Sequence, residues 1–209
     1  MKKLGFLGDS ITEGCGVTLE DRYATVLSKM LGVQEVNDGI GGTRIASQTI
    51  PTPEPSAHFD LDFVGRVAKL EKDLDLLIVF GGTNDYGHGD AIIGNENDTS
   101  VYTFYGAVKE LIRLLIEKYG KEKLLFILPL PRAGQDVSPK PQGGEPLKVY
   151  IDILEKKYQE NNLRYIDFSK MFPIEKINDL TVDGLHPNAK GHLLLANYLA
   201  KYIKDNNLL

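Results

Sequence analysis

The feature of this sequence that most limits its fold is the alternation of short apolar runs with longer segments of helical period. Continuous apolar runs are typical of strands covered on both faces, and the intervening helices supply that cover. The rhythm therefore predicts an α/β sandwich with a parallel sheet. Strands are expected at Lys3 to Leu7, Gln34 to Asn37, Leu74 to Phe80, Leu124 to Leu128 and Arg164 to Asp167.

The clearest helix is predicted over Pro146 to Glu160. Its apolar stripe follows the helical period and its opposite face is charged. The stripe consists of Leu147, Ile151, Leu154 and Tyr158. A second helix, about Thr103 to Lys118, should bury Ala107, Leu111, Leu114 and Leu115 and stop at Gly120. The C-terminal helix should begin near Asn188 and present Leu193, Ala196, Ala200 and Ile203, and shorter helices are expected at Tyr23 to Leu31 and Phe63 to Lys72.

Three long segments show neither apolar runs nor a helical period and are predicted to be loops. They are Pro51 to His58, Gly81 to Ser100 and Pro129 to Glu145, rich in Pro, Gly, Asn and Asp. Long loops are uncommon in domains of this size, and the usual reason for them is a binding site carried on a rigid scaffold.

Length and charge narrow the class of protein. A chain of 209 residues fits one domain, 1–209. The formal net charge of -5 leaves no excess of Lys and Arg to neutralise nucleic acid or an anionic membrane. No apolar stretch approaches the roughly 18 residues of a membrane span, and Leu4 to Leu7 is too short for a signal peptide. The unpaired Cys15 favours a reducing compartment, so a cytoplasmic protein is expected.

Ser10 directly follows the first predicted strand, in Gly8-Asp9-Ser10. Its hydroxyl should project from the carboxyl end of that strand, where open α/β sheets bind ligands. The tripeptide is weak by itself, because Ser10 could equally cap the next helix while Asp9 closes a turn.

An acid and a histidine stand three residues apart near the C-terminus, in Asp183-Gly184-Leu185-His186-Pro187-Asn188. A carboxylate at this spacing can accept a hydrogen bond from one imidazole nitrogen and leave the other free to take a proton. His186 is thus a candidate general base. An exposed histidine beside a helix capped by Asp183 is an equal alternative.

Two further segments offer hydrogen-bond donors for an oxyanion. Asn37-Asp38-Gly39-Ile40-Gly41-Gly42-Thr43 follows the second strand, and its glycines let a backbone N–H approach a ligand, although an ordinary glycine turn is common. Gly81-Gly82-Thr83-Asn84-Asp85 follows the third strand, where Asn84 provides either an amide donor or an Asx turn and Asp85 should support the loop.

The four segments lie at strand ends or at a helix start. Because the strand ends of a parallel sheet meet at one edge, the four can share a cleft. Their agreement favours the functional interpretation over four independent structural ones.

In these four segments the sequence resembles the SGNH hydrolases, the family of GDSL-type esterases and lipases. The family's blocks appear in order from residue 4 to about residue 195, and at Ile11 the sequence departs from the Leu of the GDSL name. The resemblance implies a three-layer α/β/α sandwich with a mostly parallel, flavodoxin-like sheet. It also implies Ser10 as nucleophile, His186 as base and Asp183 as its orienting acid.

By the same resemblance the N–H groups of Ser10 and Gly42 and the amide of Asn84 form the oxyanion hole. Two-step acyl transfer through an acyl-enzyme would follow, with no metal or organic cofactor. The other histidines, His58, His88 and His192, show no metal-ligand spacing, and His192 should lie on the surface or pack on its helix. Cys15 should lie in the core or in a wall of the site.

The expected substrate is a small acyl ester, with acetyl or another short chain favoured. Arg44, Tyr86 and His88 stand just beyond the oxyanion positions and could line its pocket, or be solvated loop residues. A catalytically silent carbohydrate- or acyl-binding module is the first rival. A flavodoxin-like nucleotide binder is the second, but Gly8 to Gly14 lacks the Lys of a Walker loop and the spacing of a dinucleotide site. The sequence leaves the natural substrate and the oligomeric state open.

Overall fold

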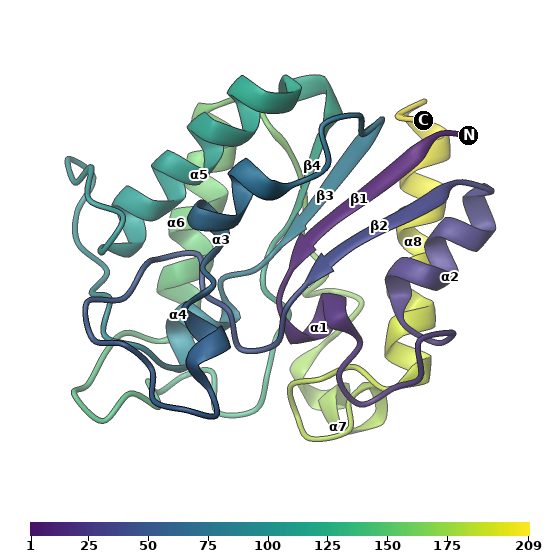
Figure 1. Cartoon of the computed structure of the whole chain (residues 1–209). Coiled ribbons are helices and arrows are strands. Elements are labelled where there is room, and N and C mark those ends of the chain that lie inside the picture. The colour runs from purple at the N-terminus through teal and green to yellow at the C-terminus, as the bar shows by residue number, and fades with distance from the viewer.

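The computed structural model describes residues 1–209 and is built around one sheet of five parallel strands (Figure 1). The strand order is β2-β1-β3-β4-β5, which is the flavodoxin-like order and confirms the predicted fold class. The strands are β1 (Lys3–Gly8), β2 (Gln34–Gly39), β3 (Leu76–Phe80), β4 (Leu124–Ile127) and β5 (Arg164–Ile166).

The strand ends differ from the predicted ends by one or two residues. β2 continues to Gly39, because its ladder with β1 stays in register up to the pair Gly8 and Gly39. β3 begins at Leu76 rather than Leu74. All five residues of β3 are buried, as expected for a strand covered on both faces.

Helices cover both faces of the sheet (Figure 1). On one face lie α3 (Phe63–Arg66), α5 (Phe104–Tyr119) and α6 (Leu147–Glu160), with one hydrophobic core beneath them. On the other face α2 (Tyr23–Leu31) and α8 (Ala189–Asp205) pack against each other over a second core. We call these the α5/α6 layer and the α2/α8 layer.

Two predicted helices need correction. The inner stripe of α8 does not include Leu193, which is 46% exposed; His192, Leu195 and Leu199 are buried instead. The other three predicted residues of this stripe, Ala196, Ala200 and Ile203, are buried as expected. The predicted helix at Phe63 to Lys72 ends as an α-helix at Arg66 and continues only as a short 3₁₀ turn, η2 (Val67–Lys69).

The long loops gather at the carboxyl edge of the sheet, together with two short helices, α1 (Ser10–Glu13) and α4 (Thr83–Gly87). α4 lies inside the segment Gly81 to Ser100 that was expected to be loop throughout. The other short elements are η1 (Ala57–Asp60), η3 (Lys121–Lys123), η4 (Ile174–Lys176) and α7 (Ile177–Leu180).

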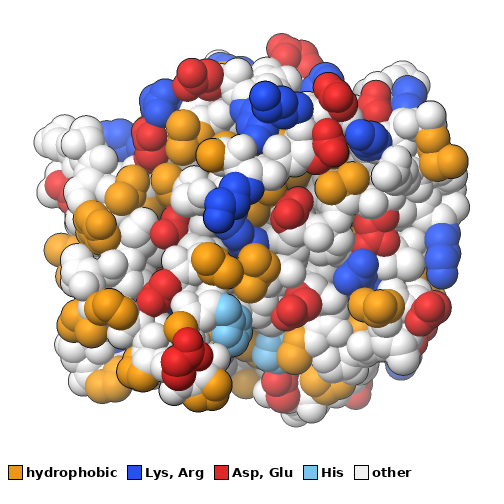
Figure 2. All heavy atoms as spheres, in the orientation of Figure 1, with side chains coloured by type: hydrophobic (Ala, Val, Ile, Leu, Met, Phe, Trp, Pro, Cys, Tyr) orange, Lys and Arg blue, Asp and Glu red, His pale blue; other side chains and the backbone are white.

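The surface carries acidic and basic side chains side by side (Figure 2). On the face shown, histidine side chains reach the surface near the lower edge, where Figure 1 shows the loops that follow the strands. None of the helices combines the length and the apolar character that crossing a bilayer would need.

Candidate active site

Ser10 is the first residue of α1 and lies just past the end of β1. The cap of α1 is Asp9, whose Oδ1 accepts the Ile11 N–H at 3.0 Å. Ser10 therefore does not cap the helix, which was the structural alternative for it. Its hydroxyl is left for another partner, and the residue is 8% exposed at the carboxyl edge.

That partner is His186, 176 residues away in the sequence. The Ser10 Oγ lies 2.9 Å from His186 Nε2, and His186 Nδ1 lies 2.7 Å from Asp183 Oδ2. A carboxylate accepts but does not donate, so Nδ1 carries the proton and Nε2 accepts the Ser10 hydroxyl. The three side chains form one continuous chain of hydrogen bonds.

Asp183 is held by its own turn. Its Oδ1 accepts the N–H groups of Leu185 and His186, at 3.0 and 2.8 Å. Partial burial raises its pKa, but hydrogen bonds from the His186 side chain and from these N–H groups outweigh it, and the net shift is downward. The helix that follows is capped by Asn188, not by Asp183, which excludes the capping alternative.

The segment after β2 brings the Gly42 N–H to the same edge. Gly42 has a φ of 70°, and a methyl group on its Cα would collide with the Phe59 ring, so only glycine fits there. The neighbouring Gly41 is close to Ser10, since a methyl group there would lie 3.7 Å from Ser10 Cβ. The backbone bonds outside helices and strands do not use the Gly42 N–H.

Asn84 lies in α4, directly after β3. Its Nδ2 donates to the carbonyl of Thr43 at 3.0 Å, so one of its two amide hydrogens is used and the other remains. The neighbouring Asp85 accepts the N–H groups of Ile45 and Ala46, each at 2.9 Å. Asp85 thus supports the loop as the sequence predicts, and it joins the two donor segments.

Two buried charged groups beneath the site were not recognised as such from the sequence. Burial raises the pKa of Asp9 to about 6, although its bond from Ile11 and the charges of His186 and Arg66 oppose the rise. Arg66 donates to the carbonyls of Gly8 and Asp38, at 3.0 and 2.6 Å. Its guanidinium ties the ends of β1 and β2 together. The role of Arg66 depends on its position in space next to the ends of β1 and β2, and no pattern in the sequence indicates that position.

The three predicted pocket residues have different outcomes. Arg44 and His88 line a cavity of about 710 Å³ beside the Gly42 segment. Tyr86 does not, because it is 1% exposed and its hydroxyl donates to the carbonyls of Gly134 and Val137. Helical period in α4 turns Tyr86 into the core while its neighbours face the loops.

Arg132 is a residue that sequence reasoning missed. Its Nη1 donates to the Thr83 hydroxyl at 3.1 Å, and its guanidinium lies 5.2 Å from the centre of the Tyr86 ring. The next residue, Ala133, donates its N–H to the Gly184 carbonyl at 2.8 Å. The loop from Pro129 thereby connects α4 with the turn that holds Asp183.

The remaining thiol and imidazoles lie outside this constellation. Cys15 is exposed rather than in the core or a wall of the site. His192 is fully buried and its Nδ1 accepts the N–H of Tyr23 at 3.1 Å, so it packs between helices and does not lie at the surface. No three His, Cys, Asp or Glu side chains are arranged to hold a metal ion.

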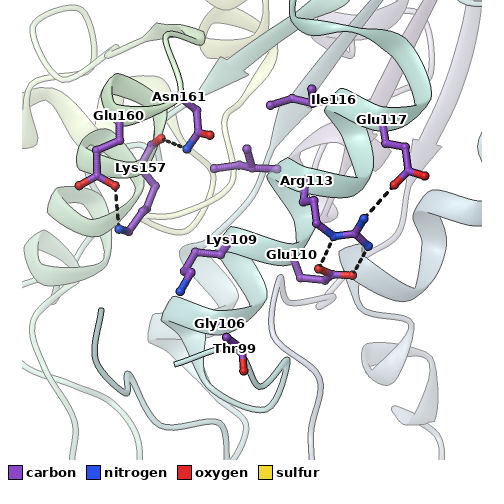
Figure 3. Close-up of a pocket in the computed structure, with 11 residues that line it drawn as sticks. Thr99, Gly106, Lys109, Glu110, Arg113, Ile116, Glu117, Lys157, Glu160 and Asn161 are labelled. Atoms are coloured by element: carbon purple, nitrogen blue, oxygen red, sulfur yellow. Dashed lines mark hydrogen bonds and ion pairs between the residues drawn. The ribbon is translucent and has the colours of Figure 1, made fainter. Parts of the chain in front are cut away.

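A separate hollow of about 650 Å³ lies between α5 and α6 (Figure 3). It contains none of the motif residues. Its charged groups are satisfied within the protein: Arg113 binds Glu110 and Glu117, and Lys157 binds Glu160. Lys109 donates to the carbonyls of Glu96 and Asp98. Because these groups are already paired and none of them is a motif residue, the candidate active site is the constellation of Ser10, His186 and Asp183 at the carboxyl edge.

Comparison with known proteins decides the family. The sequence matches the GDSL-like lipase/acylhydrolase family over residues 6–194. The chain belongs to this family. Comparison with curated proteins gives no match.

Solved structures of other proteins share the fold. A protein from Lactobacillus plantarum is 26% identical, with 98% of this chain and 97% of that chain covered and a TM-score of 0.81. A structure described as a possible lipase from Chitinophaga pinensis is 19% identical, with full coverage of both chains and a TM-score of 0.73. A carbohydrate acetylesterase family member from Sinorhizobium meliloti is 21% identical, with 98% of each chain covered and a TM-score of 0.64.

Proposed function

We propose that this GDSL-family protein is a serine esterase that hydrolyses short acyl esters through an acyl-enzyme intermediate. The observation that carries the proposal is the continuous chain from Ser10 Oγ through His186 to Asp183. Membership in an acylhydrolase family supports it. Serine, histidine and acid in this geometry are the groups that nucleophilic acyl transfer requires.

In the first step the Ser10 oxygen attacks the ester carbonyl carbon while His186 Nε2 takes the hydroxyl proton. The carbonyl π electrons move to oxygen, where the N–H groups of Ser10 and Gly42 and the free hydrogen of Asn84 can stabilise the charge. The intermediate collapses, the alcohol leaves with the proton from His186, and the acyl group stays on Ser10. A water molecule then attacks, His186 takes its proton and returns it to Ser10, and the acid departs.

Short acyl groups are favoured by the lining of the cavity beside Gly42. Thr52, Ser56, Asp90 and Gln142 are polar, and the apolar contribution comes from Ile50, Pro51, Pro53 and Phe59, of which only Phe59 is aromatic. A long-chain lipase needs a broad apolar surface to hold the chain. Arg44 and His88 belong to this lining, and we assign them to substrate binding.

The direct test is hydrolysis of p-nitrophenyl acetate by the purified protein, followed by rapid acid quenching and mass spectrometry. An acetyl group on the peptide that contains Ser10 is expected during turnover. Absence of hydrolysis would exclude this esterase assignment. The rival, a silent binding module on the same fold, predicts ligand binding with no release of p-nitrophenol and no modified peptide.

A further inference from the structure

The cavity of about 710 Å³ is larger than an acetyl group needs and lies in the range of small-molecule sites. Its walls come from three loops, those that follow Thr43, Gly87 and Pro129. No residue of the turn 181–187, which carries His186, contributes. The lining includes Arg44, Thr52, Phe59, His88 and Asp90.

Two of these walls contact the oxyanion segments directly. The Phe59 ring packs on Gly42, and the His88 N–H donates to the Asn84 carbonyl at 2.9 Å. The leaving alcohol must take its proton from His186, so it has to lie on the His186 side of the carbonyl. Because the lining residues Phe59 and His88 contact Gly42 and Asn84, and no lining residue belongs to the His186 turn, the cavity is placed to receive the acyl side of the ester.

The protonation of the His88 ring is fixed by Arg44. Arg44 Nη1 lies 2.9 Å from His88 Nδ1, and a guanidinium can only donate, so Nδ1 accepts and Nε2 carries the hydrogen. Arg44 is itself held by Asp60 and by the Phe59 carbonyl. Burial and the charge of Arg44 lower the pKa of His88 to about 4, which keeps the ring neutral.

The Nε2–H of His88 has no acceptor within the protein and is not sealed from solvent. The other polar groups of the wall are largely occupied. Thr52 donates to Asp60, and the Asp90 carboxylate accepts the N–H groups of Thr49 and Ile50. His88 is thus a pre-oriented donor beside the Phe59 ring, whose centre lies 5.1 Å from that of His88.

We propose that this cavity binds the acyl part of the substrate and that the His88 Nε2–H donates to an oxygen carried on the acyl chain. The protein then selects acyl groups with an ether, hydroxyl or carbonyl oxygen over alkyl groups of the same length. The inference rests on the proposed esterase function and names the class of acyl group that the site takes. His88 is a specificity-determining residue, since it contacts no reacting atom.

Isosteric ester pairs test this selection. p-Nitrophenyl methoxyacetate and butyrate differ by one oxygen in place of a methylene, and 3-methoxypropionate and pentanoate place that oxygen one atom farther along. The ratio of kcat/KM within each pair is measured for the wild type and for His88→Leu, so that the intrinsic reactivity of each ester cancels. Loss of one hydrogen bond should lower the ether-to-alkyl ratio by about tenfold for at least one pair.

Two further variants sharpen the result. His88→Gln can accept from Arg44 and still donate, so it should restore part of the preference. His58→Leu is the matched control, because His58 packs edge-on against Phe59 from outside the cavity lining and should leave the ratio unchanged. The far-UV circular dichroism spectrum and the thermal unfolding curve of His88→Leu report whether the variant folds.

Equal ratios in the wild type and in His88→Leu overturn the proposal while leaving the esterase assignment intact. If His88→Leu does not fold, inhibition of the wild type by free methoxyacetate and butyrate takes its place; equal inhibition constants refute the proposal. Failure of the wild type to hydrolyse any of these esters instead rejects the proposed function.

Discussion

Asn84 Nδ2 donates to the carbonyl oxygen of Thr43 at 3.0 Å. The bond fixes the plane of the amide and leaves its second hydrogen directed elsewhere. It also joins the segment after β3 to the one after β2, next to Gly42. An oxyanion donor that is held before substrate arrives does not need to reorganise during the reaction, which is what makes such donors effective.

Asn84→Ala should therefore lower kcat far more than it raises KM for p-nitrophenyl acetate. The bond to the developing oxyanion strengthens only as charge appears, and its loss should cost about 3–4 kcal/mol of transition-state stabilisation. Asn95→Ala, in an exposed turn, is the matched control. If KM alone changes in Asn84→Ala, Asn84 binds the ground state and its assigned role is wrong.

Ser10→Ala should abolish ester hydrolysis, with a loss on the order of a thousandfold or more. The change removes one oxygen from a site that is not packed in either hydrophobic core. Thermal unfolding followed by circular dichroism should consequently stay close to the wild-type curve. If the variant folds normally and still turns over substrate near the wild-type rate, the assignment of Ser10 as nucleophile is wrong.

Asp183→Asn should lower kcat by about a thousandfold or more while KM changes little. The amide oxygen can still accept the N–H groups of Leu185 and His186, so the turn should keep its shape. Without the carboxylate, the His186 tautomer that carries its hydrogen on Nδ1 is no longer favoured. Steady-state kinetics with a crystal structure of the variant would check this; an unchanged kcat would show that Asp183, which is 50% exposed, is dispensable.

A series of p-nitrophenyl esters should show kcat/KM greatest at acetate or butyrate and falling by octanoate. The apolar part of the cavity lining is limited to Ile50, Pro51, Pro53 and Phe59, so a long alkyl chain would also lie against polar groups such as Thr52 and Asp90. A rise in kcat/KM through laurate would contradict the short-chain assignment. The triad proposal would survive that result.

Asp9→Asn should change how stability depends on pH. Burial raises the pKa of Asp9 from 3.8 to about 6, so the native state binds more protons than the unfolded state between about pH 4 and 6. The free energy of unfolding of the wild type therefore falls as pH rises through that window, by about 3 kcal/mol in total. The neutral variant lacks this fall. Urea unfolding across pH 4–7 should show the stability of the wild type falling relative to Asp9→Asn, and parallel curves would contradict the assigned cause.

Most of the sheet could be predicted from the sequence because strands such as Leu76–Phe80 are apolar throughout and meet no competing signal. The helix Tyr23–Leu31 was predicted at its observed ends, where Gly32 adopts a left-handed conformation that terminates it. The bounds of β2 were harder, since Asn37 and Asp38 are poor strand formers that only the ladder with β1 keeps extended.

The candidate site was predicted where local motifs define it and missed where only tertiary structure does. Ser10 and His186 each stand in a recognisable motif, and the parallel sheet explains why they meet. Phe59 lies one residue past the loop expected at Pro51 to His58, and no local pattern indicates that its ring packs on Gly42. Tyr86 was misplaced because a short helix, α4, was not expected there.

The division of the helices into two layers has a consequence for engineering. The segment that carries Asn84 rests on the α5/α6 layer, where a methyl group on Gly82 would lie 3.0 Å from Leu154. His186 instead precedes α8, and Asn188 ties that turn to Leu180 through its backbone N–H. Because the sheet keeps the two cores apart, stabilising substitutions selected in one layer should combine additively with those selected in the other. A thermostable variant could be assembled from two independently selected sets of substitutions, one in the layer beneath Asn84 and the other in the layer next to His186.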